Sequence, residues 1–286
     1  ISIIVNAPAN PYWFTEGEVA KATAEELGYE ATVSAHRGDT NLESNLVDAA
    51  ITNNAKAIIL DPANADGSVG VVRKATEAGI AVFLVNAEIN ESGIAIGQLV
   101  SNNAQGAAIG AIKWQEIVGE EAKIVEFYGN PADNNAATRS NGYNTVINQY
   151  PGLEKVAEEV ANWDRTQVYN KMQSIIQATP EFDAVISGND EMALGAIAAM
   201  KEAGRLDGVV VGGFDGSPDA VEAIKAGEMA YTVLQPVAIF SREAVMQADH
   251  FIKNGSAMVA EEKQLFDCLL STPDNVGDYS APVTLS

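Results

Sequence analysis

The chain has 286 residues, of which 47% are hydrophobic, and a formal net charge of −22 at pH 7. Binding to nucleic acid or to an anionic membrane surface needs an excess of Lys and Arg, whereas this chain has 17 basic residues against 39 acidic ones. The composition therefore argues against both partners and is typical of a solvated surface. The single cysteine, Cys268, can form no intrachain disulfide, and its apolar neighbours in FDCLL predict a small buried residue.

Short β-branched runs alternate with helical patterns over the first hundred residues. This βαβαβ pattern predicts a parallel sheet that is covered by helices on both faces. Gly28 and Gly79 are expected to end two of the helices. The expected strands are 1–5, 29–35, 57–60, 81–85 and 94–100, and the expected helices are 13–27, 42–53 and 68–78.

The same alternation starts again after residue 102 and predicts a second lobe of similar size. The fold class expected from both halves is α/β, with two doubly wound parallel-sheet lobes and a ligand cleft between them. The expected helices of the second half are 103–118, 136–149, 165–178, 191–203 and 217–226, and its expected strands are 123–128, 155–161, 183–187, 209–214 and 231–235.

Polar and aromatic side chains follow the carboxyl ends of these strands, where open α/β sheets bind ligands. Amide groups both donate and accept hydrogen bonds, Asp accepts and Arg donates, while aromatic rings cover apolar C–H faces. The combination fits a neutral ligand with many hydroxyl groups. The residues are Asn6, Asn10, Tyr12, Trp13, Asn86, Arg139, Trp163, Asn189, Asp190, Asp215 and Gln235.

Each of these residues also has a purely structural interpretation, which the sequence leaves open. Asn and Asp after strands commonly cap helices or form turns. Arg139 could form a surface ion pair, and Tyr12 with Trp13 could pack onto the following helix. Caps do not require three aromatic residues at strand ends, so the set as a whole favours a binding site.

Four segments resemble the ribose-type sugar-binding proteins of bacterial ABC transporters, which have the type I periplasmic binding protein fold. The segments are NPYWF (10–14), NDEMALGA (189–196), VVGGFDGSPDA (210–220) and TVLQP (232–236), and the resemblance extends to about Ser271. It implies two lobes joined by a three-segment hinge, one of 1–101 plus 236–264 and the other of 102–235 plus 265–286. It also implies sugar contacts at Asn10, Tyr12, Trp13, Arg139, Trp163, Asn189, Asp215 and Gln235.

The chain departs from the ribose type directly after the segment AVFL (81–84). Where the ribose type has an Asp-Arg pair that grips the sugar, this chain has Val85 and Asn86. Trp13 and Trp163 stand where the ribose type has Phe, and they are bulkier. A smaller cavity with fewer charged contacts predicts a four- or five-carbon sugar alcohol or an unusual pentose rather than ribose.

The resemblance implies a solute-binding protein of a carbohydrate ABC importer and not an enzyme. The lobes are expected to close on the sugar and to present it to a membrane permease, with no cofactor, no metal and no nucleic-acid partner. The resemblance further implies a monomer in the periplasm, or outside the cell as a membrane-anchored lipoprotein whose signal segment is absent from this sequence. Residues 272–286 lie beyond the resemblance and are expected to form either an ordered strap or a mobile tail.

Two other classes of protein remain open. The same fold forms the effector-binding domain of lactose-repressor-type regulators, which carry an N-terminal helix-turn-helix that this sequence lacks. An enzyme has little local support, because the sequence contains no GxGxxG, GxxxxGK[ST], G-x-S-x-G or H-E-x-x-H motif. The two histidines, His36 and His250, are expected to be surface or packing residues.

Overall fold

The computed structural model describes residues 1–179, 181–280 and 284–285, and the chain divides into two compact units. Unit 1 consists of Ile1–Ser101, Ala132–Asn134 and Pro236–Phe266, and unit 2 consists of Asn102–Pro131, Asn135–Gln235 and Asp267–Ser286. Each unit has a six-stranded sheet among its described residues.

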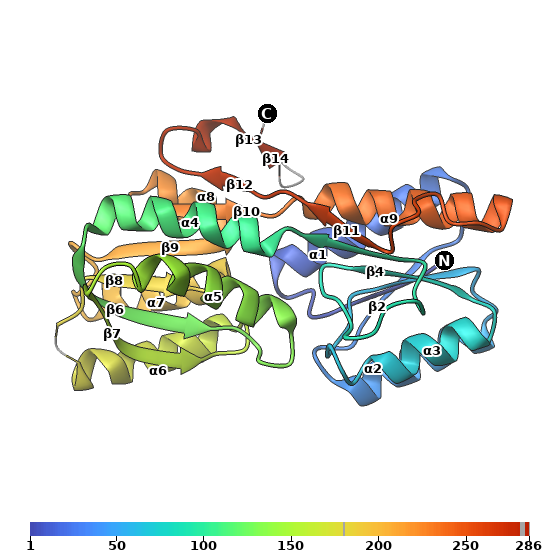
Figure 1. Cartoon of the computed structure of the whole chain (residues 1–286), viewed down its shortest axis with the longest axis horizontal. Helices are drawn as coiled ribbons and strands as arrows, with labels where there is room; N and C mark the ends of the chain where they lie inside the picture. The colour runs from blue at the N-terminus through green and yellow to red at the C-terminus, as the bar shows by residue number, and fades with distance from the viewer. Residues whose placement is uncertain (180, 281–283, 286) are drawn as a thin grey trace. The chain divides into compact units, whose positions relative to one another are not determined.

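Unit 1 is a parallel sheet with helices on both faces (Figure 1). Helices α1 and α9 pack together over one face, and α2 and α3 lie together over the other. The central strands β3 and β4 are buried along their whole length, which explains their unbroken apolar sequences. The strand order is β11 (Lys263–Phe266), β5 (Gly97–Ser101), β4 (Ala81–Val85), β3 (Ala57–Leu60), β1 (Ser2–Val5), β2 (Thr32–Ala35), and the helices are α1 (Pro11–Glu26), α2 (Thr40–Thr52), α3 (Val69–Glu77) and α9 (Val237–Asn254).

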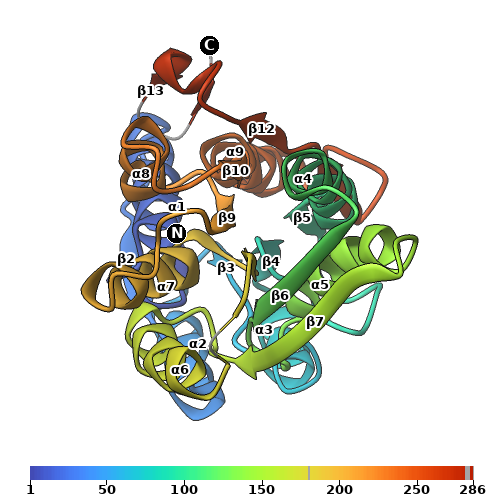
Figure 2. The same cartoon turned by 90° about the vertical axis from the view of Figure 1, so that its left-hand side faces the viewer.

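Unit 2 repeats this plan (Figure 2). Helices α4 and α5 lie on one side of its sheet, and α6, α7 and α8 lie on the other. The strand order is β12 (Leu269–Ser271), β10 (Tyr231–Leu234), β9 (Val210–Asp215), β8 (Ala184–Ser187), β6 (Glu121–Tyr128), β7 (Gly152–Val160), and the helices are α4 (Asn103–Val118), α5 (Asn134–Ile147), α6 (Arg165–Ala178), α7 (Asp190–Glu202) and α8 (Pro218–Lys225).

One strand of unit 2 was not predicted, and it is antiparallel to its neighbour. The sequence predicts parallel sheets, but the edge strand β12 pairs antiparallel with β10, with Thr232 opposite Ser271. The physical reason is connectivity, because β12 follows β11 after two residues and has no helix to carry the chain back to the start of the sheet. Cys268 is 2% exposed, as its apolar neighbours predicted.

The C-terminal segment has ordered structure where it is described. The 3₁₀ helix η1 (Val276–Asp278) packs against α8, and β13 (Tyr279–Ser280) pairs antiparallel with β14 (Thr284–Leu285). The sequence left open whether residues 272–286 form an ordered strap or a mobile tail. The described part of this segment is an ordered strap on unit 2. Residues 281–283 and 286 lie outside the described part of the chain.

No described helix combines the length and the apolar character that a transmembrane span requires.

Candidate ligand-binding site

The segment NPYW begins helix α1 in unit 1. The Asn10 side chain accepts a hydrogen bond from the backbone N–H of Tyr12 at 2.9 Å, and Pro11 occupies the first helical position, where no N–H is needed. This cap fixes the first turn, in which Tyr12 and Trp13 are 4% and 9% exposed. Asn10 therefore has the capping role that the sequence left open, and a ligand contact by its side chain stays a prediction.

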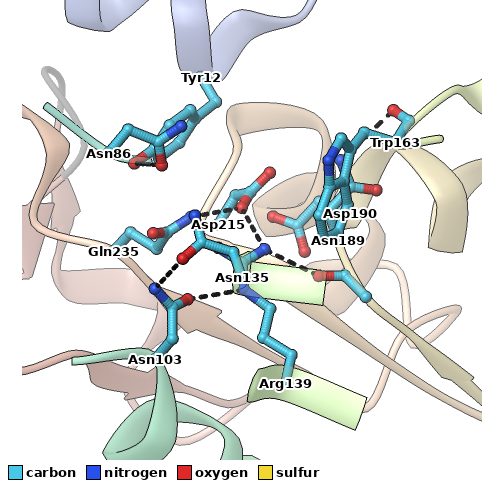
Figure 3. A network of polar contacts seen from close by, with 12 residues as sticks. Tyr12, Asn86, Asn103, Asn135, Arg139, Trp163, Asn189, Asp190, Asp215 and Gln235 are labelled. Atoms are coloured by element: carbon cyan, nitrogen blue, oxygen red, sulfur yellow. Dashed lines mark hydrogen bonds and ion pairs between the residues drawn. The ribbon is translucent and has the colours of Figure 1, made fainter. Parts of the chain in front are cut away.

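Tyr12 belongs to a chain of side-chain hydrogen bonds within unit 1. The Tyr12 hydroxyl donates to Asn86 Oδ1 at 2.9 Å, as Figure 3 shows, and Asn86 Nδ2 donates to Asp61 Oδ2 at 3.1 Å. Asn86 directly follows β4 and has a φ of 62°, a left-handed conformation that Asn tolerates better than most residues. The two hydrogen bonds, to Tyr12 and to Asp61, give the Asn86 amide one defined orientation. Asn6, which follows β1, is half-buried, and its carbonyl accepts from the Arg37 N–H at 3.3 Å.

Arg139, on α5, is the centre of a polar network in unit 2 (Figure 3). Its Nε donates to Asn103 Oδ1 at 2.7 Å, and its Nη1 donates to the Gly188 carbonyl at 2.9 Å. The guanidinium carbon lies 3.9 Å from the ring centroid of Phe214 and 5.2 Å from that of Trp163. The sequence left open the alternative that Arg139 forms an ion pair at the surface. Arg139 is only 4% exposed, so this alternative is excluded. A buried, planar donor held on aromatic faces suits recognition of oxygen-rich ligands.

Asp215 ends β9 and lies next to this guanidinium. Its Oδ1 is 3.5 Å from Arg139 Nη1 and accepts a hydrogen bond from Gln235 Nε2 at 2.7 Å. Burial raises the pKa of Asp215, the charge of Arg139 lowers it, and the nearby Asp190 raises it again. Arg139, Asp215 and Gln235, which come from three distant segments, are therefore brought together.

Trp163 is held in one position by its backbone and by two glycines. It follows β7 with a φ of 66°, and it is 6% exposed. A Cβ on Gly129 would lie 2.1 Å from its ring, and a Cβ on Gly188 would lie 3.0 Å from it. Asn189 donates from Nδ2 to the Trp163 carbonyl at 3.4 Å and caps α7 by accepting from Met192 N–H at 2.9 Å. The ring occupies a slot that only glycine leaves open.

Comparison with known proteins identifies the family. A family model described as "Periplasmic binding protein domain" matches residues 1–256. The chain belongs to the periplasmic binding protein family. It is 48% identical to a D-apiose import binding protein of Paraburkholderia graminis, over 97% of this chain and 88% of that protein. It is 30% identical to the ribose import binding protein RbsB of Salmonella typhimurium, over 88% of this chain and 84% of that protein.

A solved structure extends the comparison to the fold. A Caulobacter myo-inositol binding protein, bound to myo-inositol, has a TM-score of 0.91 and 26% identity, over 98% of this chain and 95% of that one. The segments NPYWF, NDEMALGA, VVGGFDGSPDA and TVLQP indicated a resemblance to the sugar-binding proteins of ABC transporters. These comparisons confirm that resemblance.

The residues predicted from this periplasmic binding protein's sequence fall into two sets, one in each unit. Each set follows the carboxyl ends of the strands of its own sheet, and the hydrogen bonds described above join members within a set. Their role as ligand contacts stays a prediction. The unit 1 set is Asn6, Asn10, Tyr12, Trp13 and Asn86, and the unit 2 set is Arg139, Trp163, Asn189, Asp215 and Gln235.

Asn103 and Asn135 of unit 2 join the network without having been predicted as site residues, whereas Asp190 was among the predicted strand-end residues. Asn103 donates from Nδ2 to Asn135 Oδ1 at 2.8 Å while it accepts from Arg139. Asp190 accepts from Thr232 Oγ1 at 2.6 Å and from Ser217 N–H at 2.7 Å, which fixes the start of α8. Asn103 comes two residues after β5, so the strand-end rule applied to that strand would have found it.

Burial raises the pKa of Asp190 to about 6, although the hydrogen bonds from Thr232 and Ser217 lower it. No group of three His, Cys, Asp or Glu side chains within the described ranges is arranged to hold a metal ion.

Proposed function

We propose that this periplasmic binding protein captures a small neutral sugar, with D-apiose as the first candidate, and delivers it to the membrane permease of an ABC importer. The single observation that carries the proposal is the buried network of Arg139, Asp215 and Gln235 in unit 2. Its charged donor and acceptor lie beside each other at the edge of an open sheet, and each is suited to a sugar hydroxyl. The D-apiose import binding protein that is 48% identical to this chain supports the candidate.

D-apiose also fits the expectation from Trp13, Trp163 and Asn86. It is a branched five-carbon sugar, hence an unusual pentose, and it carries no charge. Two buried indole rings offer flat apolar surface for its C–H groups, and the Asn86 amide offers both a donor and an acceptor.

Capture would proceed by closure of the two units on the ligand. Each unit supplies one set of polar groups, and a ligand that contacts both sets favours the closed state because only that state satisfies all of them. The closed protein would then dock on the permease. We place the protein in the periplasm or on a lipid anchor outside the membrane, as a monomer that needs no cofactor and performs no catalysis.

The alternative of a repressor's effector-binding domain is not favoured. The relatives at 48% and 30% identity are both named as import binding proteins.

A panel of sugars tests the proposal by thermal unfolding and by calorimetric titration. The panel contains D-apiose, D-ribose, xylitol, erythritol and myo-inositol. At one hundred times its dissociation constant, a true ligand adds about 2.7 kcal/mol to the free energy of unfolding, and the melting temperature rises accordingly. We expect the largest shift with D-apiose. Tight binding of D-ribose with no response to D-apiose would contradict the assignment of an unusual pentose, and no response to the whole panel would contradict the sugar class.

A further inference from the structure

Asn103 of α4 bridges two residues of α5 that lie one helical turn apart. Its Oδ1 accepts from Arg139 Nε at 2.7 Å, and its Nδ2 donates to Asn135 Oδ1 at 2.8 Å (Figure 3). Asn135 and Arg139 are four residues apart in one helix, so their side chains lie on the same face of it. All three residues are buried. This amide bridge (Asn135–Asn103–Arg139) therefore ties two further side chains to a predicted sugar contact.

The hydrogen bonds of the amide bridge can run in only one direction. An arginine Nε–H donates and cannot accept, so the Asn103 atom that faces it must be the oxygen. The Asn103 nitrogen then faces Asn135, whose oxygen accepts from it. If the Asn103 amide turned over, its N–H groups would face the guanidinium, and buried donors would lose their acceptors at a cost in free energy. Asn135 therefore holds the Asn103 amide in the orientation that Arg139 requires.

Other contacts fix the remaining sides of the Arg139 guanidinium. Its Nη1 donates to the Gly188 carbonyl at 2.9 Å, and its carbon lies 3.9 Å from the ring centroid of Phe214. The first turn of α4 also reaches this ring, because a Cβ on Gly106 would lie 2.8 Å from Phe214 Cζ. Neither of the two hydrogen bonds of the guanidinium uses Nη2. The Nη2 end is therefore the part that these contacts leave for a ligand.

The first turn of α4 is itself fastened to the segment that follows β11. Asn102 Nδ2 donates to Asp267 Oδ1 at 2.8 Å. Gln105 and Cys268 exchange two hydrogen bonds, from Gln105 Nε2 to the Cys268 carbonyl at 3.1 Å and from Cys268 N–H to Gln105 Oε1 at 2.9 Å. These contacts hold the backbone on both sides of Asn103. Asn103 is therefore suited to set the position of the arginine rather than to follow it.

We propose that Asn103 and Asn135 are positioning residues for sugar recognition. Asn135 orients the Asn103 amide, and Asn103 sets the rotation of the Arg139 guanidinium so that Nη2 is presented to a sugar hydroxyl. The proposal rests on the sugar-binding function only for this last step. Sugars differ in the directions of their hydroxyls, so a donor must be held in a fixed direction to tell them apart, and neighbouring hydrogen bonds are what hold it.

A ligand-free double-mutant cycle tests the amide bridge. Arg139→Lys keeps a positive charge but has no Nε to donate, and Asn135→Ala removes the oxygen that orients Asn103. If Asn135 acts on Arg139 through Asn103, the effect of both substitutions on the urea-unfolding equilibrium constant should differ by about threefold or more from the product of the single effects. The same cycle in the Asn103→Ala background should show no coupling. Independent effects in the wild-type background, or coupling that survives Asn103→Ala, would overturn the amide bridge.

Calorimetric titration with D-apiose tests the positioning role by rescue. Asn135→Leu removes the acceptor oxygen and should weaken binding by about tenfold or more, whereas Asn135→Asp keeps an acceptor and should stay within about threefold of the wild type. Asn135→Ala replaces Asn135→Leu if the larger side chain prevents folding. Asn141→Leu and Asn141→Asp, exposed changes on α5, are the matched controls and should bind as the wild type does. Equal losses in the Leu and Asp variants of Asn135, or wild-type affinity in Asn135→Leu, would overturn the positioning role.

The two experiments separate this proposal from the choice of ligand. If the wild type does not bind D-apiose, the proposed ligand fails, while the unfolding cycle still decides whether Asn135 acts on Arg139 through Asn103. The rescue series is then repeated with whichever sugar of the panel raises the melting temperature.

Discussion

Arg139 Nη1 and Asp215 Oδ1 lie 3.5 Å apart in unit 2, and their side chains are only 5% and 6% exposed. This separation is longer than the roughly 2.7–2.9 Å of a charge-assisted hydrogen bond. The two groups stay apart because each is held by its own neighbours, Arg139 by Asn103 and Gly188, and Asp215 by Gln235. The pair is therefore a fixed donor and a fixed acceptor next to each other.

Removing either member should weaken sugar binding. We expect Arg139→Ala and Asp215→Ala each to cost at least about 2 kcal/mol of binding free energy, because each leaves buried polar partners unsatisfied. Each should also lower the free energy of unfolding by about 3–5 kcal/mol. Calorimetric titration and urea unfolding measure the two effects. Arg242→Ala, at an exposed ion pair with Glu26, is the control and should change stability by less than about 1 kcal/mol. Unchanged affinity in both test variants would exclude this network from the site.

Filling the slot beneath Trp163 should reduce affinity without touching a polar group. Gly129→Ala places a methyl group 2.1 Å from the ring, so the indole must move. We expect a loss of stability of about 1–3 kcal/mol from the overpacking, together with weaker sugar binding. Gly70→Ala is the matched control, because its Cβ meets nothing within 4 Å, and it should be neutral or slightly stabilising. Wild-type affinity in a folded Gly129→Ala protein would show that the ring position does not matter for binding.

The buried Asp190 should make unit 2 less stable as the pH rises. Its pKa is raised to about 6, so the folded state holds this proton more tightly than the unfolded chain does. The stabilisation is complete below about pH 4 and is lost as the pH rises through about 6, with a total change of up to about 3 kcal/mol. Urea unfolding between pH 4 and pH 7 should therefore show a gentler decline for Asp190→Asn than for the wild type. Asp219→Asn, on an exposed side chain of α8, should keep the wild-type slope. Identical slopes in all three proteins would refute the assignment.

A further substitution should separate stability from binding. The hydroxyls of Tyr143 and Tyr231 lie 2.5 Å apart in the core of unit 2, and both residues are at most 1% exposed. Tyr231→Phe leaves the Tyr143 hydroxyl without this partner, which should lower the free energy of unfolding by about 1–3 kcal/mol. Affinity for the sugar should stay within about twofold of the wild type when it is measured well below the melting temperature. A large loss of affinity would mean that this core pair also shapes the site.

Much of the fold followed from hydrophobic periodicity and glycine positions. The predicted ranges 57–60 and 81–85 are β3 and β4, and 103–118 and 165–178 are α4 and α6. Gly28 and Gly79 follow the ends of α1 and α3 with φ values of 87° and 82°, which is the left-handed geometry that ends helices. These features are local, so a single sequence is enough to predict them.

The features that could not be predicted depend on partners far away in the chain. The antiparallel pairing of β12 with β10 joins segments more than 30 residues apart, and Asn86 donates to Asp61, 25 residues earlier. The burial of Glu16 could have been predicted from the sequence. Glu16 lies on the same face of α1 as the buried residues Trp13 and Ala20, where the helical period predicts an apolar residue. A charged residue at a position that should be buried is a reason to look for a functional role of its side chain.

The edge strands β11 and β12 have a consequence for how the protein is made. Both come from residues 263–271, and they complete the sheets of unit 1 and unit 2 respectively. On a ribosome, neither sheet can be finished until residues 263–271 have been synthesised, and these residues come after all the other strands of both sheets. The nascent chain therefore keeps two open sheet edges until these two strands have been made, which favours a long-lived unfinished state over early, unit-by-unit folding. A chain that ended before residue 263 would lack β11 in unit 1 and β12 in unit 2, so both sheets would be one strand short.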